Sequence, residues 1–115
     1  MERVCLLEQI EREGGVTALV GGEAVAVIRT YDDRVYALSN YDPIGRASVL
    51  ARGIVGSRSV GNEEVPFVAS PLFKQAFDLR TGVCLDEPTV VVPTYEVLVE
   101  DGVVSIGARR ETITT

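Results

Sequence analysis

The segment Tyr95–Gly107, with the sequence YEVLVEDGVVSIG, constrains the fold most strongly because it predicts a β-hairpin of fixed register. Asp101-Gly102 separates two apolar runs, and this dipeptide suits a type I′ turn, in which both central residues have positive φ. Such a turn places Val99 opposite Val104 and puts the neighbouring apolar pair on the same face. The hairpin therefore has one buried face and must pack on a core.

Turn residues divide the rest of the chain into short apolar runs of the same kind. Gly21-Gly22 predicts a second hairpin, and residues Tyr31–Arg34 predict a turn. Many short strands separated by turns are typical of an all-β sandwich or barrel. The other expected elements are strands at Val35–Leu38, Glu64–Ala69 and Ala76–Leu79, a short helical turn within Leu6–Glu13, and a surface loop at Ser57–Glu63.

The length of 115 residues fits one domain that needs no disulfide or metal for stability. We expect a single domain over residues 1–108. The last residues lack apolar spacing, so a flexible C-terminal tail is expected over residues 109–115.

The charge and the cysteines narrow the class of protein. A formal net charge of −6 disfavours nucleic acids and anionic membrane surfaces, which attract clustered Lys and Arg. No apolar run approaches the ~20 residues of a membrane-spanning helix, and the charged first residues are unlike a signal peptide. Cys5 and Cys84 are isolated, which favours reduced thiols, although a disulfide between them stays open. We therefore expect a soluble cytoplasmic protein.

Groups for autonomous catalysis are scarce. The chain has no histidine, so it has no imidazole base and no Ser-His-Asp or Cys-His unit. The carboxylate pairs Asp32-Asp33 and Asp86-Glu87 are more typical of solvated loops, because sequence neighbours point apart. No ligand-spaced cluster suits zinc. We predict no catalytic residue, no cofactor-binding residue and no metal ligand.

The stretch Ser70–Gly82, SPLFKQAFDLRTG, has the outline of an iron–sulfur loop without its ligands. The second cluster loop of Rieske-type proteins is approximately C-P-x-H-G-x-x-F-D-x-x-T-G. Ser70 stands at the cysteine position, Phe73 at the histidine position and Lys74 at the glycine position. The residues that match the pattern are Pro71, Phe77, Asp78, Thr81 and Gly82.

The segment Ala37–Ile44, ALSNYDPI, resembles the first cluster loop, in which C-x-H follows A-x-x-N. The best alignment puts Asp42 at the cysteine and Ile44 at the histidine. With Ser70 and Phe73 these are four degenerate ligand positions. A Rieske cluster needs two thiolates and two imidazoles, so it could not be held here.

The two loop regions together resemble the small subunit of the cytoplasmic NAD(P)H-dependent assimilatory nitrite reductase. The resemblance covers about Val4 to Gly107 and is carried by NYDPIGRASVLARGIVG and VASPLFKQAFDLRTGVCLDEP. Those subunits are similar to Rieske ferredoxin domains but lack the cluster ligands. One departure is Ile44, where related subunits often have an aromatic residue. The resemblance implies a Rieske-like antiparallel β-sandwich with a small hairpin subdomain formed by the loop regions.

The resemblance also implies a partner and a reaction. The nitrite reductase large subunit would carry FAD, an iron–sulfur cluster and sirohaem, and would reduce nitrite to ammonium with electrons from the nicotinamide. This chain would be a cofactor-free accessory subunit without activity of its own. The alternative is a stand-alone Rieske-like module that binds a different redox partner.

Four loop residues are candidates for the partner interface: Ile44, Arg46, Phe73 and Lys74. Lys74 could form a basic docking tip together with Arg46 and Arg52, although most exposed cations only solubilise a protein. Phe73 could be an interface anchor. We favour a core position for Phe73, where its replacement by alanine would cost about 3–5 kcal/mol.

The residues that follow in the second loop are expected to be structural. Asp78 and Thr81 can close a turn on nearby backbone N–H groups. Gly82 is expected to hold a backbone conformation that a Cβ would strain. Ser70 has no base to activate it, so it is expected to be a loop hydroxyl and not a nucleophile.

Overall fold

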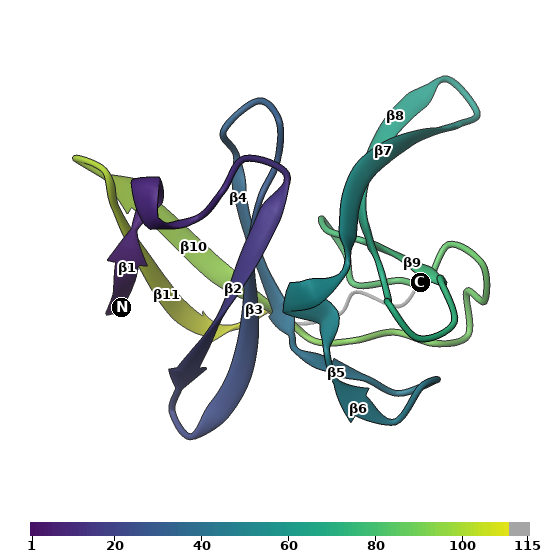
Figure 1. Cartoon of the computed structure of the whole chain (residues 1–115), viewed down its shortest axis with the longest axis horizontal. Coiled ribbons are helices and arrows are strands. Elements are labelled where there is room, and N and C mark those ends of the chain that lie inside the picture. Colours follow the sequence, from purple (N-terminus) through teal and green to yellow (C-terminus); the bar gives the residue numbers. More distant parts are fainter. Residues whose placement is uncertain (111–115) are drawn as a thin grey trace.

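The computed structural model describes residues 1–110, which form three antiparallel sheets (Figure 1). The largest sheet has six strands in the order β1-β11-β10-β4-β3-β2. Its strands are β1 (Glu2–Leu6), β2 (Gly14–Val20), β3 (Glu23–Arg29), β4 (Val35–Ser39), β10 (Thr94–Glu100) and β11 (Val103–Arg109).

The chain between β4 and β10 forms a smaller subdomain beside this sheet (Figure 1). It holds the short pair β5 (Tyr41–Asp42) and β6 (Ala47–Ser48) and a three-stranded sheet of β7 (Ile54–Val60), β8 (Glu63–Ala69) and β9 (Ala76–Asp78). The helices of residues 1–110 are the 3-10 turns η1 (Leu7–Gln9) and η2 (Leu50–Arg52). Neither is long enough to cross a membrane.

The two predicted hairpins are confirmed. In β10–β11, Val99 lies opposite Val104 and Asp101-Gly102 forms the turn, with φ values of 52° and 75°. Gly21-Gly22 joins β2 to β3 with φ values of 58° and 81°. Positive φ at both central residues gives the twist that matches the flanking strands, so local turn chemistry sets both registers.

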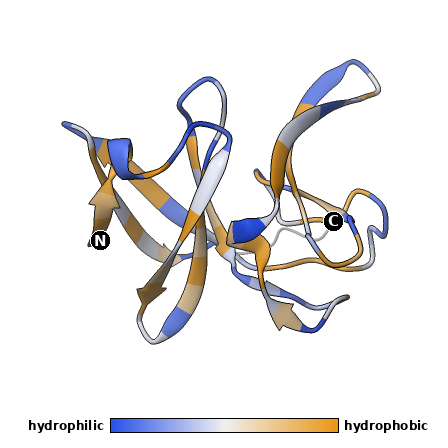
Figure 2. Cartoon of the chain, in the orientation of Figure 1, coloured by the Kyte–Doolittle hydropathy of each residue, from blue (hydrophilic) through white to orange (hydrophobic). Residues whose placement is uncertain are grey.

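The segment Ser57–Glu63, expected to be a surface loop, instead belongs to the long β7–β8 hairpin, with its turn at Gly61-Asn62. The expectation was wrong because the outer half of this hairpin protrudes into solvent and is hydrophilic (Figures 1 and 2). A strand with both faces solvated lacks the apolar alternation that indicates a strand. The hydroxyls of Ser57 and Ser59 donate hydrogen bonds to Glu64 across the pair.

Both ends of the chain differ from the expected boundaries. Glu2–Leu6 forms a strand that was not predicted, whereas the short helical turn expected within Leu6–Glu13 is confirmed by η1. At the other end, β11 continues through Arg109, and the N–H of Arg110 donates to the carbonyl of Thr94 at 2.8 Å. The ordered domain therefore extends two residues beyond 108, while residues 111–115 of the expected tail lie outside the described residues.

Strand β3 is buried on both faces because the small subdomain covers the side that the curved sheet leaves open. Val25 and Val27 face a core cluster inside the large sheet, whereas Ala26 and Ile28 face a cluster shared with the small subdomain. All four are 0% exposed. The second cluster includes Leu38, Leu50, Val55, Val68, Phe77, Leu79, Cys84 and Val92. Cys5 and Cys84 are both free thiols, which excludes the disulfide.

Candidate functional site

The two segments with the degenerate ligand positions meet at one end of the small subdomain. We call residues 42–46, between β5 and β6, and residues 70–74, after β8, the two tip loops. The hydroxyl of Ser70 donates a hydrogen bond to Oδ2 of Asp42 at 2.6 Å. Leu72 packs on Gly45, where an added Cβ would lie 2.5 Å from its Cδ1. The two segments, far apart in the sequence, are therefore in direct contact.

The tip loops have the same backbone construction. In the first, the N–H of Arg46 donates to the carbonyl of Asp42 at 2.7 Å; in the second, Lys74 donates to Ser70 at 3.0 Å. Arg46 and Lys74 both have left-handed backbones, with φ values of 58° and 65°. A proline follows the first residue of each loop. Each loop is thus a closed turn that ends on a basic residue in a conformation that favours glycine.

The first side chain of each loop also closes its own turn. Oδ1 of Asp42 accepts the N–H of Ile44 at 2.9 Å, and Oγ of Ser70 accepts the N–H of Leu72 at 3.3 Å. These are the Asx and ST turns that short polar side chains form two residues along the backbone. The expectation that Ser70 is a loop hydroxyl agrees with this geometry.

The four degenerate positions have different surroundings. Asp42 and Ser70 are 0% exposed, and Ile44 is half-buried against the second core cluster. Phe73 is 62% exposed, so its predicted core position is wrong. The space between the loops is already filled by the Asp42–Ser70 pair, and the ring projects outward instead. A loss of core packing is therefore not expected when Phe73 is replaced.

These side chains do not fit an iron–sulfur cluster. The positions hold a carboxylate, a hydroxyl, an aliphatic chain and an exposed ring, whereas a Rieske cluster needs thiolates and imidazoles. Cys84 is fully buried and pairs with Phe77 in an isolated bridge, and Cys5 lies in β1 of the other sheet. Within residues 1–110, no three His, Cys, Asp or Glu side chains gather closely enough to hold a metal ion.

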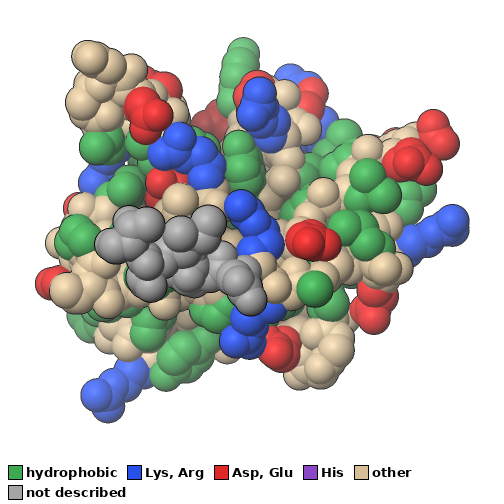
Figure 3. All heavy atoms as spheres, turned by 180° about the vertical axis from the view of Figure 1, so that it is seen from behind, with side chains coloured by type: hydrophobic (Ala, Val, Ile, Leu, Met, Phe, Trp, Pro, Cys, Tyr) green, Lys and Arg blue, Asp and Glu red, His purple; other side chains and the backbone are tan. Residues whose placement is uncertain are grey.

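The outer surface of the tip combines apolar side chains with cations. Leu72 is 45% exposed beside Phe73, and Arg46 and Lys74 are exposed at the ends of their loops. Lys74 is the only lysine in the sequence. On the rear face shown in Figure 3, acidic and basic side chains are interspersed, so charge marks no single patch there. Exposed aromatic side chains and arginine are enriched in protein interfaces, whereas lysine is not.

The turn after the second tip loop is closed by the residues expected to be structural. The carboxylate of Asp78 accepts the N–H of Arg80 at 2.8 Å, and Thr81 accepts the N–H of Val83 at 3.2 Å. Gly82 has a φ of 81° and donates its N–H to the carbonyl of Asp78 at 2.7 Å. These contacts agree with the turn-closing roles that the sequence predicted.

Asp86 anchors the exit of the second tip loop. Its carboxylate accepts the N–H of Ala76 at 2.8 Å and forms an ion pair with Arg58 at 3.1 Å. The N–H of Ala76, and then the guanidinium of Arg58, hold the pKa of the Asp86 carboxyl below its usual value. No sequence pattern indicates this contact, because the partners are 10 and 28 residues away.

The lowered pKa of Asp86 predicts acid sensitivity. A carboxyl with a lower pKa in the folded state contributes stability above its unfolded value of 3.8, and that stability is lost as pH falls through the folded pKa. Asp86→Asn should therefore lower the melting temperature at neutral pH and flatten its fall between about pH 5 and pH 2.5. If the melting temperatures of the wild type and of Asp86→Asn fall in parallel as the pH is lowered, Asp86 does not have this role.

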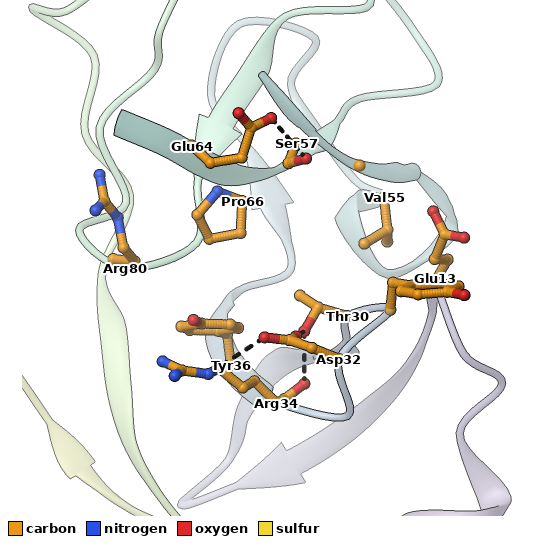
Figure 4. A pocket seen from close by; sticks show the side chains of 12 residues that line it. Glu13, Thr30, Asp32, Arg34, Tyr36, Val55, Ser57, Glu64, Pro66 and Arg80 are labelled. Carbon is orange, nitrogen blue, oxygen red and sulfur yellow. Dashed lines mark hydrogen bonds and ion pairs between the residues drawn. The ribbon is translucent and has the colours of Figure 1, made fainter. Parts of the chain in front are cut away.

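A separate cleft of ≈450 Å³ lies between the turn before β4 and the β7–β8 hairpin (Figure 4). Tyr36, Val55 and Pro66 supply its apolar lining. Most of its charged residues are already engaged: Arg34 pairs with Asp32 at 3.3 Å, and Arg80 pairs with Asp78 at 3.1 Å. Two hydroxyls of the cleft donate to carboxylates, Thr30 to Asp32 and Ser57 to Glu64, but the chain has no histidine that could act as an imidazole base beside them. The lining residues come from separate segments that no sequence motif connects.

Comparisons with known proteins agree with this geometry. Residues 1–107 match the model of the Rieske-like [2Fe-2S] domain family. The nitrite reductase (NADH) small subunit of Escherichia coli K12 is 42% identical over 104 residues, which are 90% of this chain and 93% of that protein. The solution structure of the nitrite reductase [NAD(P)H] small subunit from Erwinia carotovora has a TM-score of 0.73 at 40% identity, covering 99% of this chain and 85% of that one.

A third relative is a much longer protein than this chain. The nitrite reductase [NAD(P)H] large subunit of Klebsiella oxytoca is 39% identical over 109 residues, which are 95% of this chain but only 11% of that protein. A domain similar to this chain is therefore part of a much longer polypeptide there. The matches confirm the resemblance inferred from the tip loops, together with the all-β Rieske-like fold class.

Proposed function

This chain belongs to the Rieske-like [2Fe-2S] domain family and, within it, to the nitrite reductase small subunits. We therefore propose that it is the accessory subunit of a cytoplasmic assimilatory NAD(P)H-dependent nitrite reductase. The large subunit carries FAD, sirohaem and an iron–sulfur cluster and reduces nitrite to ammonium. This chain supplies no cofactor. The observation that carries the proposal is similarity along nearly the whole small subunit, combined with four ligand positions that cannot bind a cluster.

The relative from Klebsiella oxytoca supports the large subunit as the partner. Its large subunit includes a region similar to this chain within one polypeptide. Domains that are covalently linked in one protein work within reach of each other, because the linkage gives them a high effective concentration. A separate chain has to achieve the same proximity through a docking surface.

We propose the tip loops as that docking surface. Phe73 provides an exposed aromatic anchor, and Arg46 and Lys74 provide cations beside it. Ile44 is half-buried and packs the first tip loop against the second core cluster. The expected counterpart on the large subunit is an apolar depression with an acidic rim, because complementary charge guides association and fixes orientation.

Purification of the tagged chain from cells grown on nitrate tests the proposed function. We expect a large polypeptide that contains flavin and sirohaem to co-purify, and NAD(P)H-dependent nitrite reduction to appear in the eluate. A strain without this chain should lose that activity, and the restored gene should return it. Intact activity in the deletion strain, with no such partner recovered, would favour the alternative module with a different redox partner.

Lys74 offers a test of the tip that separates strain from docking. It occupies the glycine position of the family pattern, and its left-handed backbone costs about 1 kcal/mol relative to glycine. Lys74→Gly should therefore keep or slightly raise the melting temperature, since relief of strain offsets the greater entropy of the unfolded chain. The same change should weaken binding to the large subunit by about three- to tenfold at low salt and less at high salt.

The control for this prediction is Arg3→Gln, which removes an exposed cation from β1 in the large sheet. Its affinity should equal that of the wild type at both salt concentrations. If Lys74→Gly also binds like the wild type at low salt, Lys74 has no part in docking.

A further inference from the structure

We propose that the buried Ser70–Asp42 hydrogen bond replaces the cross-link that a metal cluster provides between these loops, and that it holds the tip in its docking shape. The inference rests on the proposed function and assigns positioning roles to two residues that contact no partner. In the family pattern, both loops donate ligands to one cluster, which ties them together. Here the two cysteine positions are tied directly to each other.

The contact has the properties of a specific buried link. The Oγ–Oδ2 distance of 2.6 Å is typical of a hydroxyl that donates to a carboxylate, one of the stronger hydrogen bonds in proteins. Both residues are 0% exposed, so water does not compete for either group. Burial of a carboxylate is costly unless donors satisfy it, and here each oxygen of Asp42 has one: the Ser70 hydroxyl and the Ile44 N–H.

The link joins residues that are 28 positions apart and lie at the first position of each tip loop. Because each loop closes on its own first residue, fixing Asp42 to Ser70 also fixes Arg46 relative to Lys74. Leu72 packs against Gly45 next to the link, and a Cβ on Gly45 would lie 2.7 Å from Oδ2 of Asp42. The interior of the tip is thus filled, and its basic and aromatic groups are held on the outside. Such pre-organisation strengthens binding by reducing the entropy lost on association.

Ser70→Ala tests the link, because it removes the donor while the carboxylate remains. We expect about tenfold weaker binding to the large subunit at a temperature well below unfolding. In the free protein, we expect about tenfold faster hydrogen exchange at the N–H groups of Ile44, Arg46, Leu72 and Lys74. Exchange in β2 and β3 should not change. If Ser70→Ala does not fold, Ser70→Cys keeps the volume of the side chain with a weaker donor.

Two further variants distinguish loss of the Ser70–Asp42 bond from loss of the carboxylate charge and from removal of any serine hydroxyl. Asp42→Asn can still accept the Ile44 N–H and donate its amide to Oγ of Ser70, so its binding should stay within about threefold of the wild type. Ser59→Ala removes an exposed hydroxyl that donates to Glu64 in the β7–β8 hairpin, and its binding should not change.

The outcomes distinguish this inference from the proposed function. If the wild type binds the large subunit and Ser70→Ala binds within about twofold, the link has no positioning role, while the proposed function stands. A loss of binding in Asp42→Asn that Ser70→Ala does not share would assign the effect to the carboxylate alone and overturn the inference. If the wild type does not bind the large subunit, the proposed function fails and the inference fails with it.

Discussion

Replacement of Phe73 by alanine is expected to weaken binding to the large subunit by about 30-fold or more, with a change in melting temperature below about 3 °C. The ring is 62% exposed and lies between Leu72 and Lys74 at the outer surface of the tip. Surface substitutions usually change stability by less than about 0.5 kcal/mol, whereas aromatic anchors at the centre of an interface contribute about 2 kcal/mol or more.

The measurement for Phe73→Ala is a titration of the purified variant with the large subunit, together with a thermal melt of each protein alone. Leu19→Ala is the matched control, because Leu19 is 71% exposed on edge strand β2 of the other sheet. Its binding should equal that of the wild type. A large fall in melting temperature for Phe73→Ala would show that the ring contributes to the core. Unchanged affinity would show that it has no part in the interface.

The elements predicted correctly from sequence are those whose geometry is set by neighbouring residues. Asp101-Gly102 and Gly21-Gly22 each fix a hairpin, because only a few residue types tolerate positive φ at both turn positions. The closed turn around Gly82 was predictable for the same reason. Local turn chemistry thus sets the register of the β2–β3 and β10–β11 pairs of the large sheet.

The orientation of side chains in the tip could not be predicted in this way. Phe73 occupies a position whose family counterpart points toward a cluster, and nothing local indicates that it turns outward. The interior of the tip is occupied by the contact between Asp42 and Ser70, which are 28 residues apart. A shared pattern was present in the sequence, since both loops place proline second and a basic residue fifth, but the pattern does not reveal the hydrogen bond.

The β7–β8 hairpin shows the opposite limitation. Its outer strands are polar because both faces are solvated, and hydrophobic periodicity is informative only where one face is buried. Arg58 lies over the ring of Phe67 at 5.4 Å and pairs with Asp86, so the outer half of the hairpin is attached to the segment that follows β9. Long-range contacts of this kind, and not an apolar face, stabilise this part of the hairpin.

Gly82→Ala is expected to destabilise the domain by about 3–5 kcal/mol, which corresponds to a fall in melting temperature of about 15 °C. Two costs add. Gly82 has a φ of 81°, where an L side chain is strained, and its Cβ would lie 2.0 Å from the carbonyl oxygen of Val92. Rotation of a side chain cannot relieve this overlap, because the overlapping atom belongs to the backbone of Val92. That backbone is held in place, since the N–H of Val92 donates to the carbonyl of Gly82 at 2.9 Å.

Gly61→Ala separates the two costs in the same protein. Gly61 has a φ of 62° in the turn between β7 and β8, and an added Cβ there would have no neighbour within 4 Å. Its replacement should cost only about 1 kcal/mol, the strain of the left-handed backbone alone. Denaturant unfolding of both variants gives the difference, which measures the overlap with Val92. Equal losses would mean that the backbone around Val92 moves freely, and the small subdomain would then be too compliant to hold a fixed docking tip.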